Sequence, residues 1–183
     1  MSADRAAFQK LISAYLTKYE HTHGHVMSTN AIAQLVSTNL YYRRFFPFYT
    51  FNVVGGLDES GAGAVYGYDA IGSFERIPYC VQGSGSALAT SILDNQVQTW
   101  DMAGIVYVCF HWHICIRECV CPQIEFKTHP QNFRKLSVEE TVLLVKDVFT
   151  SIGERDIYTG DSVDIYVITK DGITHESFAL KKD

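Results

Sequence analysis

The sequence has no concentration of positive charge. Its 183 residues include 15 Lys and Arg against 20 Asp and Glu, which gives a net charge of -5. Arg43-Arg44 is the only basic pair among aromatic residues, and a pair of this kind is favoured near a helix C-terminus by the helix dipole. No other Lys or Arg block offers a phosphate-binding patch, so the composition argues against a nucleic-acid partner.

Long hydrophobic runs are also missing. The apolar run from Met102 to Ile116 is interrupted by His111 and His113 and is too short to cross a bilayer. Instead of a signal peptide, residues 1–20 show the spacing of an amphipathic helix. We therefore expect no membrane role and a location in the cytoplasm and nucleus. Thiols are normally reduced there, and the five cysteines predict no disulfide framework.

What is present is typical of one globular domain. Hydrophobic residues make up 47% of the chain and charged residues 19%, which suits a packed core rather than disorder. Ser28 can cap a second helix after the first, and short aromatic strands follow at 51–54, 64–68 and 73–79. The Gly-rich turn 82–86 then leads into a third helix over 87–95. It matches neither a P-loop nor a dinucleotide fingerprint.

The last third of the chain has the clearest local signals. Ser137 and Glu140 have the spacing of a capping box, and apolar residues recur at helical spacing from there to Gly153. The run 163–169 predicts a strand, Asp171-Gly172 predicts a tight turn, and 173–180 predicts the returning strand. The whole order of elements indicates an α+β layered domain.

Four motifs in this order are distinctive. They are Tyr-Tyr-Arg-Arg-Phe-Phe-Pro at 41–47, Gly-Gly-Leu-Asp at 55–58, Leu-Asp-Asn-Gln-Val at 93–97 and Glu-Arg-Asp-Ile-Tyr-Thr-Gly-Asp at 154–161. Through them the chain resembles the 20S proteasome β subunits over about residues 10–97 and 126–183. Within that family it is most similar to the non-catalytic β type-1 branch, which occupies the sixth ring position.

The resemblance implies a fold and a role. The fold is the four-layer αββα sandwich of N-terminal-nucleophile hydrolases, here in a single domain over 1–183. The role is that of a structural subunit, without peptidase activity or cofactor, that helps to close a ring around a proteolytic chamber for ubiquitin-dependent protein degradation. Its partners would be other proteasome β subunits and subunits of the α ring.

The chain departs from the family pattern in two places. The family has strands before the first helix, so we expect a fold that lacks its N-terminal strands. The segment Gln98 to Glu125 holds both tryptophans and four of the five cysteines, where the family has a short link. We expect this segment to be an atypical insertion, typical of non-coding read-through. Its alternating apolar residues predict an exposed strand that the fold can lose.

Two other functions, a hydrolase and a zinc module, compete with the structural role. A hydrolase of this class needs a free N-terminal nucleophile whose own amine acts as base, and Ser2 is the residue available if Met1 is removed. Ser84, Asp156 and Thr159 stand where catalytic relatives place auxiliary residues, and the alternative is structural hydrogen bonding. A zinc module would use a cluster of five residues, although it lacks paired Cys-x-x-Cys knuckles. The cluster comprises His111, His113, Cys115, Cys119 and Cys121.

Overall fold

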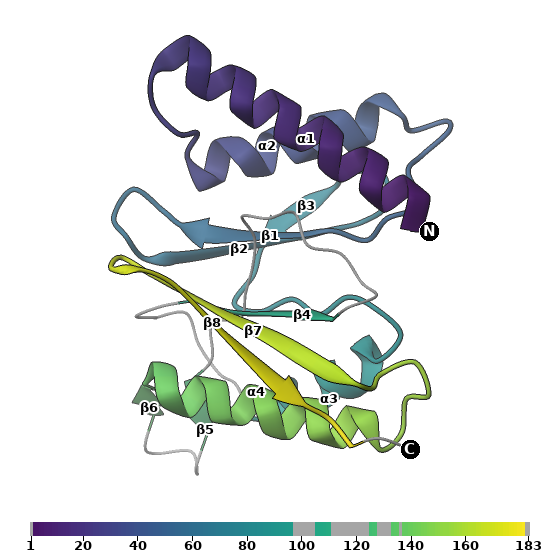
Figure 1. Ribbon diagram of the computed structural model, residues 1–183, viewed down its shortest axis with the longest axis vertical. Coiled ribbons are helices and arrows are strands. Elements are labelled where there is room, and N and C mark those ends of the chain that lie inside the picture. Colours follow the sequence, from purple (N-terminus) through teal and green to yellow (C-terminus); the bar gives the residue numbers. More distant parts are fainter. Residues whose placement is uncertain (1, 97–104, 111–124, 128–132, 136, 182–183) are drawn as a thin grey trace.

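The computed structural model describes residues 2–96, 105–110, 125–127, 133–135 and 137–181. Among them, side chains are described for 4–96 and 137–181. The predicted α+β class is confirmed, because helices and antiparallel sheets alternate along the chain. Figure 1 shows α1 and α2 above one sheet, and α3 and α4 below a second sheet.

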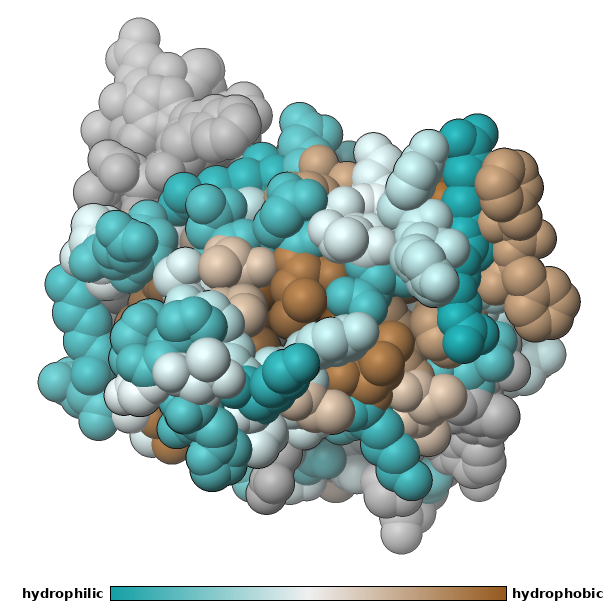
Figure 2. Space-filling model, turned by 90° about the horizontal axis from the view of Figure 1, so that it is seen from above, coloured by the Kyte–Doolittle hydropathy of each residue, from teal (hydrophilic) through white to brown (hydrophobic). Residues whose placement is uncertain are grey.

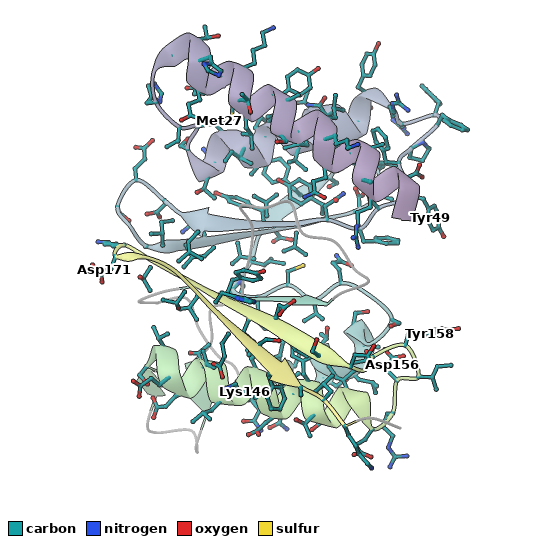
Figure 3. The ribbon with its side chains drawn as sticks, viewed as in Figure 1. Met27, Tyr49, Lys146, Asp156, Tyr158 and Asp171 are labelled. Atoms are coloured by element: carbon teal, nitrogen blue, oxygen red, sulfur yellow. The ribbon has the colours of Figure 1, made fainter. Side chains whose placement is uncertain are left out.

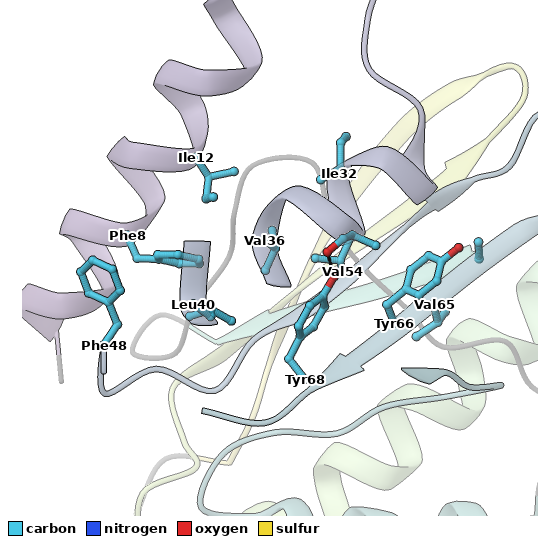
Figure 4. Close-up of a cluster of buried hydrophobic side chains, with 12 residues drawn as sticks. Phe8, Ile12, Ile32, Val36, Leu40, Phe48, Val54, Val65, Tyr66 and Tyr68 are labelled. Atoms are coloured by element: carbon cyan, nitrogen blue, oxygen red, sulfur yellow. Dashed lines mark hydrogen bonds between the residues drawn. The ribbon is translucent and has the colours of Figure 1, made fainter. Parts of the chain in front are cut away.

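The first two helices form as the sequence predicts. Helix α1 spans Ser2–His23 and α2 spans Thr29–Tyr42. Ser28 caps α2, since its hydroxyl oxygen accepts from the Ala31 amide at 3.4 Å. The apolar faces of both helices turn toward the sheet below, where Figure 4 shows their side chains meeting. The buried residues of this upper core are Phe8, Ile12, Ile32, Ala33, Val36, Leu40, Phe48, Val54, Ala64, Val65, Tyr66 and Tyr68.

The first sheet has the order β1-β2-β3, with antiparallel neighbours. Its strands are β1 (Val53–Leu57), β2 (Gly63–Tyr68) and β3 (Phe74–Arg76). The predicted boundaries of two strands were wrong. Strand β1 runs on through Gly55 and Gly56, and β3 ends before Pro78, which has no amide to donate to a ladder.

A close approach explains why glycine is accepted inside β1. A Cβ on Gly56 would lie 2.5 Å from Oγ1 of Thr29, which is the first residue of α2. The Thr29 hydroxyl instead donates to the Leu57 carbonyl at 2.7 Å, and Tyr68 donates to the Ala33 carbonyl at 2.7 Å. The helix therefore rests directly on the sheet backbone, which a larger residue at position 56 would prevent.

The second sheet has the order β4-β7-β8. Strands β7 (Ser162–Thr169) and β8 (Gly172–Ala179) form the predicted hairpin, with Asp171 in its turn. Strand β4 (Ile105–Phe110) lies inside the segment 98–125 and pairs antiparallel with β7 from Ile105↔Ile168 to Phe110↔Val163. A strand therefore forms over 105–110, inside the run where alternation predicts one. Because these residues cover one edge of β7, the deletion described below tests the expectation that the fold can lose the segment.

Helices α3 (Ser86–Gln96) and α4 (Val138–Gly153) pack below this sheet (Figure 1). The capping box at the start of α4 is confirmed: the Glu140 amide donates to Ser137 Oγ at 3.2 Å, and the Ser137 amide donates to Glu140 Oε2 at 2.9 Å. A two-stranded sheet of β5 (Glu125–Lys127) and β6 (Phe133–Lys135) precedes α4. The lower core comprises Ala89, Leu93, Leu144, Val145, Val148, Ile152, Val163, Ile165 and Leu180.

The capping box yields the first prediction. Replacing Ser137 with Ala leaves the first turn of α4 without its side-chain acceptor. We expect the free energy of unfolding to fall by about 1 kcal/mol, measured by urea denaturation. Ser151→Ala is the matched control, because this exposed serine bonds only to the Asp147 carbonyl one turn back in the same helix. An equal loss in both variants would contradict a capping role.

The pairing of β4 yields the second prediction. Deleting residues 105–110 opens the edge of β7 that β4 covers, and the amides on that edge then face solvent. We expect these β7 amides to exchange hydrogen faster in the deletion variant, measured by hydrogen exchange with mass spectrometry. Peptides of β2 serve as the internal control, since β2 lies between β1 and β3. Unchanged protection of β7 would show that β4 adds nothing to the sheet.

Candidate functional site

Three residues predicted to lie together do so. Ser84 Oγ donates to Asp156 Oδ2 at 2.7 Å, although the two residues are 72 positions apart in the chain. Thr159 Oγ1 donates to the same carboxylate oxygen, also at 2.7 Å. Asp156 therefore joins the turn before α3 to the loop between α4 and β7, where Figure 3 shows it beside Tyr158.

The end of α4 fixes the position of Asp156. The amides of Arg155 and Asp156 both donate to the Ile152 carbonyl, at 2.9 and 2.8 Å, which closes the last turn of the helix. The other carboxylate oxygen of Asp156 then accepts from the Tyr158 amide at 3.2 Å. The Thr159 amide donates to the Asp156 carbonyl at 3.1 Å. This loop geometry is the kind that Asp favours, because its short side chain bonds to the backbone two residues on.

Glycine fixes the position of Ser84. A Cβ on Gly85 would lie 2.6 Å from Ile152 Cγ2 and 3.2 Å from Asp156 Oδ2, so only glycine lets this turn approach the loop so closely. Gly83 adopts a φ of 120°, a conformation that other residues rarely take. Gly85 was not predicted as a site residue. The sequence signal that could have found it is its place directly beside Ser84, which the family resemblance marks as an auxiliary position.

The bonding pattern suits structure rather than nucleophilic attack. Both hydroxyls use their hydrogens to donate to one carboxylate oxygen. The cluster therefore holds two segments together, and a separate nucleophile would be needed for hydrolysis.

The structure does not supply Ser2 to this cluster. Ser2 is the first residue of α1, whose N-terminal end lies above the first sheet. Asp156 lies in the loop between α4 and β7, near the level of α3 (Figure 3).

Among the side chains that the structure describes, Cys80 is the one cysteine, and it is free. It packs against the upper core, and burial raises the pKa of its thiol to about 11. The thiolate is the reactive form of cysteine. A thiol with so high a pKa stays protonated at neutral pH, so Cys80 is a packing residue.

The five proposed zinc ligands, His111, His113, Cys115, Cys119 and Cys121, lie outside the described residues. Within the described ranges, no group of three or more His, Cys, Asp or Glu side chains is arranged to hold a metal ion. Over the same ranges, none of the helices combines the length and apolar character that crossing a membrane requires.

Comparison with known proteins gives one consistent family. The model of the family "Proteasome subunit" matches residues 1–103. A relative from Dictyostelium discoideum, "Proteasome subunit beta type-1", is 44% identical over 183 residues, which is all of this chain and 67% of the relative. Its namesake from Arabidopsis thaliana is 44% identical over 99% of this chain and 71% of the relative. A more distant relative from Schizosaccharomyces pombe, "Probable proteasome subunit beta type-6", is 36% identical over 99% of this chain and 72% of the relative.

These matches span both sheets and the Ser84, Asp156 and Thr159 cluster, since they cover 99–100% of the chain. The chain therefore belongs to the proteasome subunit family.

Proposed function

We propose that the chain is a structural, non-catalytic β subunit of the 20S proteasome core particle. The observation that carries this proposal is the 44% identity, over the whole chain, to relatives named as proteasome subunits of β type-1. Such a subunit acts through its shape. It fills one position in a ring of related subunits and forms part of the wall around a chamber in which unfolded proteins are degraded.

The finer description of the fold is part of the same proposal. We take residues 1–183 as a single domain built on the αββα sandwich of N-terminal-nucleophile hydrolases. The stacking in Figure 1 supports this, because helix pairs lie outside two antiparallel sheets. A structural role needs this frame to be rigid, and the two buried cores above and below the sheets supply rigidity.

Bonding at the cluster supports a non-catalytic role. Ser84 and Thr159 donate to Asp156 and thereby join α3 to the loop before β7. In a catalytic relative the same positions would assist a nucleophile. Here both hydroxyls donate to one carboxylate oxygen, so we propose that they only stabilise the fold. This is the reason for preferring a structural subunit to a threonine-type endopeptidase.

The partners follow from the family. We propose that the chain contacts neighbouring β subunits and subunits of the α ring in a hetero-oligomeric particle, in the cytoplasm and the nucleus. Its net charge of -5 and the absence of a basic block from the sequence support a protein partner over a nucleic acid.

The assembly proposal can be tested by native gel fractionation. We expect an epitope-tagged copy of the chain, expressed in cells of its source, to migrate with particles of 20S size and to co-purify with α-ring and β-ring subunits in constant ratio. The tag alone, fused to an unrelated protein of similar size, is the control. Migration of the whole tagged population as free chain would contradict the proposed function.

The structural role of the cluster gives a further prediction. Asp156→Ala removes the shared acceptor of two hydroxyls, and we expect the free energy of unfolding to fall by about 1–3 kcal/mol in urea denaturation. Asp147→Ala is the matched control, since this aspartate lies exposed on α4. We also expect only background turnover of fluorogenic peptides by the wild-type chain and by both variants. Turnover that Asp156→Ala abolishes without unfolding the chain would show a catalytic cluster instead.

A further inference from the structure

The segment 41–51, at the end of α2 and in the loop that follows, exposes an unusual set of aromatic side chains. Phe45 and Phe46 are 97% and 83% exposed, although phenylalanine normally lies in a core. Figure 2 shows apolar side chains protruding at the edge of the molecule where this segment lies. We call this set the aromatic surface. It comprises Tyr41, Tyr42, Arg44, Phe45, Phe46, Tyr49 and Phe51.

The backbone holds these side chains outward in a fixed turn. The Arg44 amide donates to the Tyr41 carbonyl and the Phe46 amide donates to the Arg43 carbonyl, both at 3.0 Å. Pro47 then disfavours a helical backbone at Phe46. Phe48 turns the other way and packs on Phe8 of α1, with ring centroids 5.1 Å apart. One aromatic residue therefore fastens the loop to the core while its neighbours point away from it.

Arg44 lies among the exposed rings. Its guanidinium is 5.6 Å from the Tyr41 ring and 5.9 Å from the Phe45 ring, and it donates to the Tyr41 hydroxyl at 2.9 Å. Exposed aromatic rings stacked with arginine have the composition of interface hot spots. Because the stack exists before any partner binds, less side-chain freedom is lost on association.

The size of the aromatic surface also fits a stable interface. A fully exposed aromatic side chain offers about 150–250 Å², so the six rings together offer on the order of 800 Å². That exceeds the largest apolar patch of a typical monomer, about 300–600 Å². It equals the area of about 800 Å² that each partner buries in a standard protein interface.

Charge decides between a second copy of this chain and a different chain. The segment 41–51 contains Arg43 and Arg44 and no Asp or Glu. An acidic side chain does contact the segment from outside: the carboxylate of Asp4 in α1 accepts from the Tyr49 amide at 3.1 Å. A two-fold contact of this face with itself would bring guanidinium groups of both copies together without carboxylates inside the segment to pair them.

We propose that the aromatic surface is the contact face for a neighbouring, different subunit of the proteasome subunit family. The matching face of that subunit offers an apolar pocket for Phe45 and Phe46, with Asp or Glu side chains at its rim opposite Arg44. This inference rests on the proposed function, since it takes the partner to be another subunit of the same particle.

The first experiment measures incorporation into particles of 20S size for the double variant Phe45→Ser/Phe46→Ser. Loss of two central aromatic side chains should lower the incorporated fraction at least about tenfold. Ile173→Thr is the matched control, because Ile173 is 62% exposed on the β7–β8 hairpin, which lies on the opposite side of the molecule from Tyr49 (Figure 3). The urea midpoint of each variant should stay at the wild-type value. Wild-type incorporation by a folded double variant would overturn the proposal.

The second experiment tests the charge of the partner. Arg44→Glu reverses the charge opposite the expected carboxylates, whereas Arg44→Lys keeps it. We expect the glutamate variant to lose incorporation and the lysine variant to retain most of it. Equal incorporation of both variants would overturn the acidic rim.

The third experiment identifies the partner directly. A photoreactive benzoylphenylalanine replaces Phe46, the cells are irradiated, and mass spectrometry identifies the cross-linked peptide. The expected product joins position 46 to a different proteasome subunit, near an Asp or Glu. A cross-link to a second copy of this chain, to a protein outside the family, or to nothing would overturn the proposal. If the wild-type chain enters no particle, the proposed function fails. In that case, only the cross-link from position 46 tests whether the aromatic surface contacts another subunit.

Discussion

Packing of α4 on β7 is the contact on which the rest of the lower half depends. The capping box at Ser137 fixes where the helix begins, and its buried stripe meets Val163 and Ile165 of the strand. Burying each such aliphatic side chain contributes about 1.5–3 kcal/mol. The last turn at Ile152 then sets the position of Asp156, and through it the turn at Ser84. The cluster is thus placed by a helix end, and the helix is placed by its apolar face.

Residues 137–180 could be read from the sequence because local signals there agree with one another. A capping box, a helical repeat, a Gly stop and an Asp-Gly turn each predict a boundary that the structure contains. The strands at 51–79 were less predictable, since Gly55 and Gly56 are disfavoured in isolated strands. What makes them acceptable is contact with Thr29, a residue distant in sequence. The alternation of apolar residues predicts that a strand forms at 105–110, but it cannot predict that this strand pairs with β7.

The positions of Ser84, Asp156 and Thr159 in the sequence could not by themselves predict that the three side chains meet. Ser84 and Asp156 lie in separate loops, and the family motif was the only sequence evidence that related them. The structure adds the physical reason: Gly85 leaves room beside Ile152 for the two loops to meet. The motif therefore predicted which residues meet, and the packing explains how. The zinc module at 111–121 was only an alternative to the structural role, and its candidate ligands lie outside the described residues.

The two groups of aromatic residues show how one composition serves two purposes. At the first sheet, Phe74 stacks on Tyr68 and meets Tyr66 edge-on, and Tyr68 also bonds to α2. Their burial stabilises the isolated chain. The rings of the aromatic surface do not, since Phe45 and Phe46 contact solvent in this chain alone. A turn that keeps such rings exposed lowers the solubility of the isolated chain and adds nothing to its core. This cost is explained if another subunit covers the rings in the assembled particle. The same frame thus supports a stable fold on the inside and assembly on the outside, and neither role requires the Ser84 cluster to react.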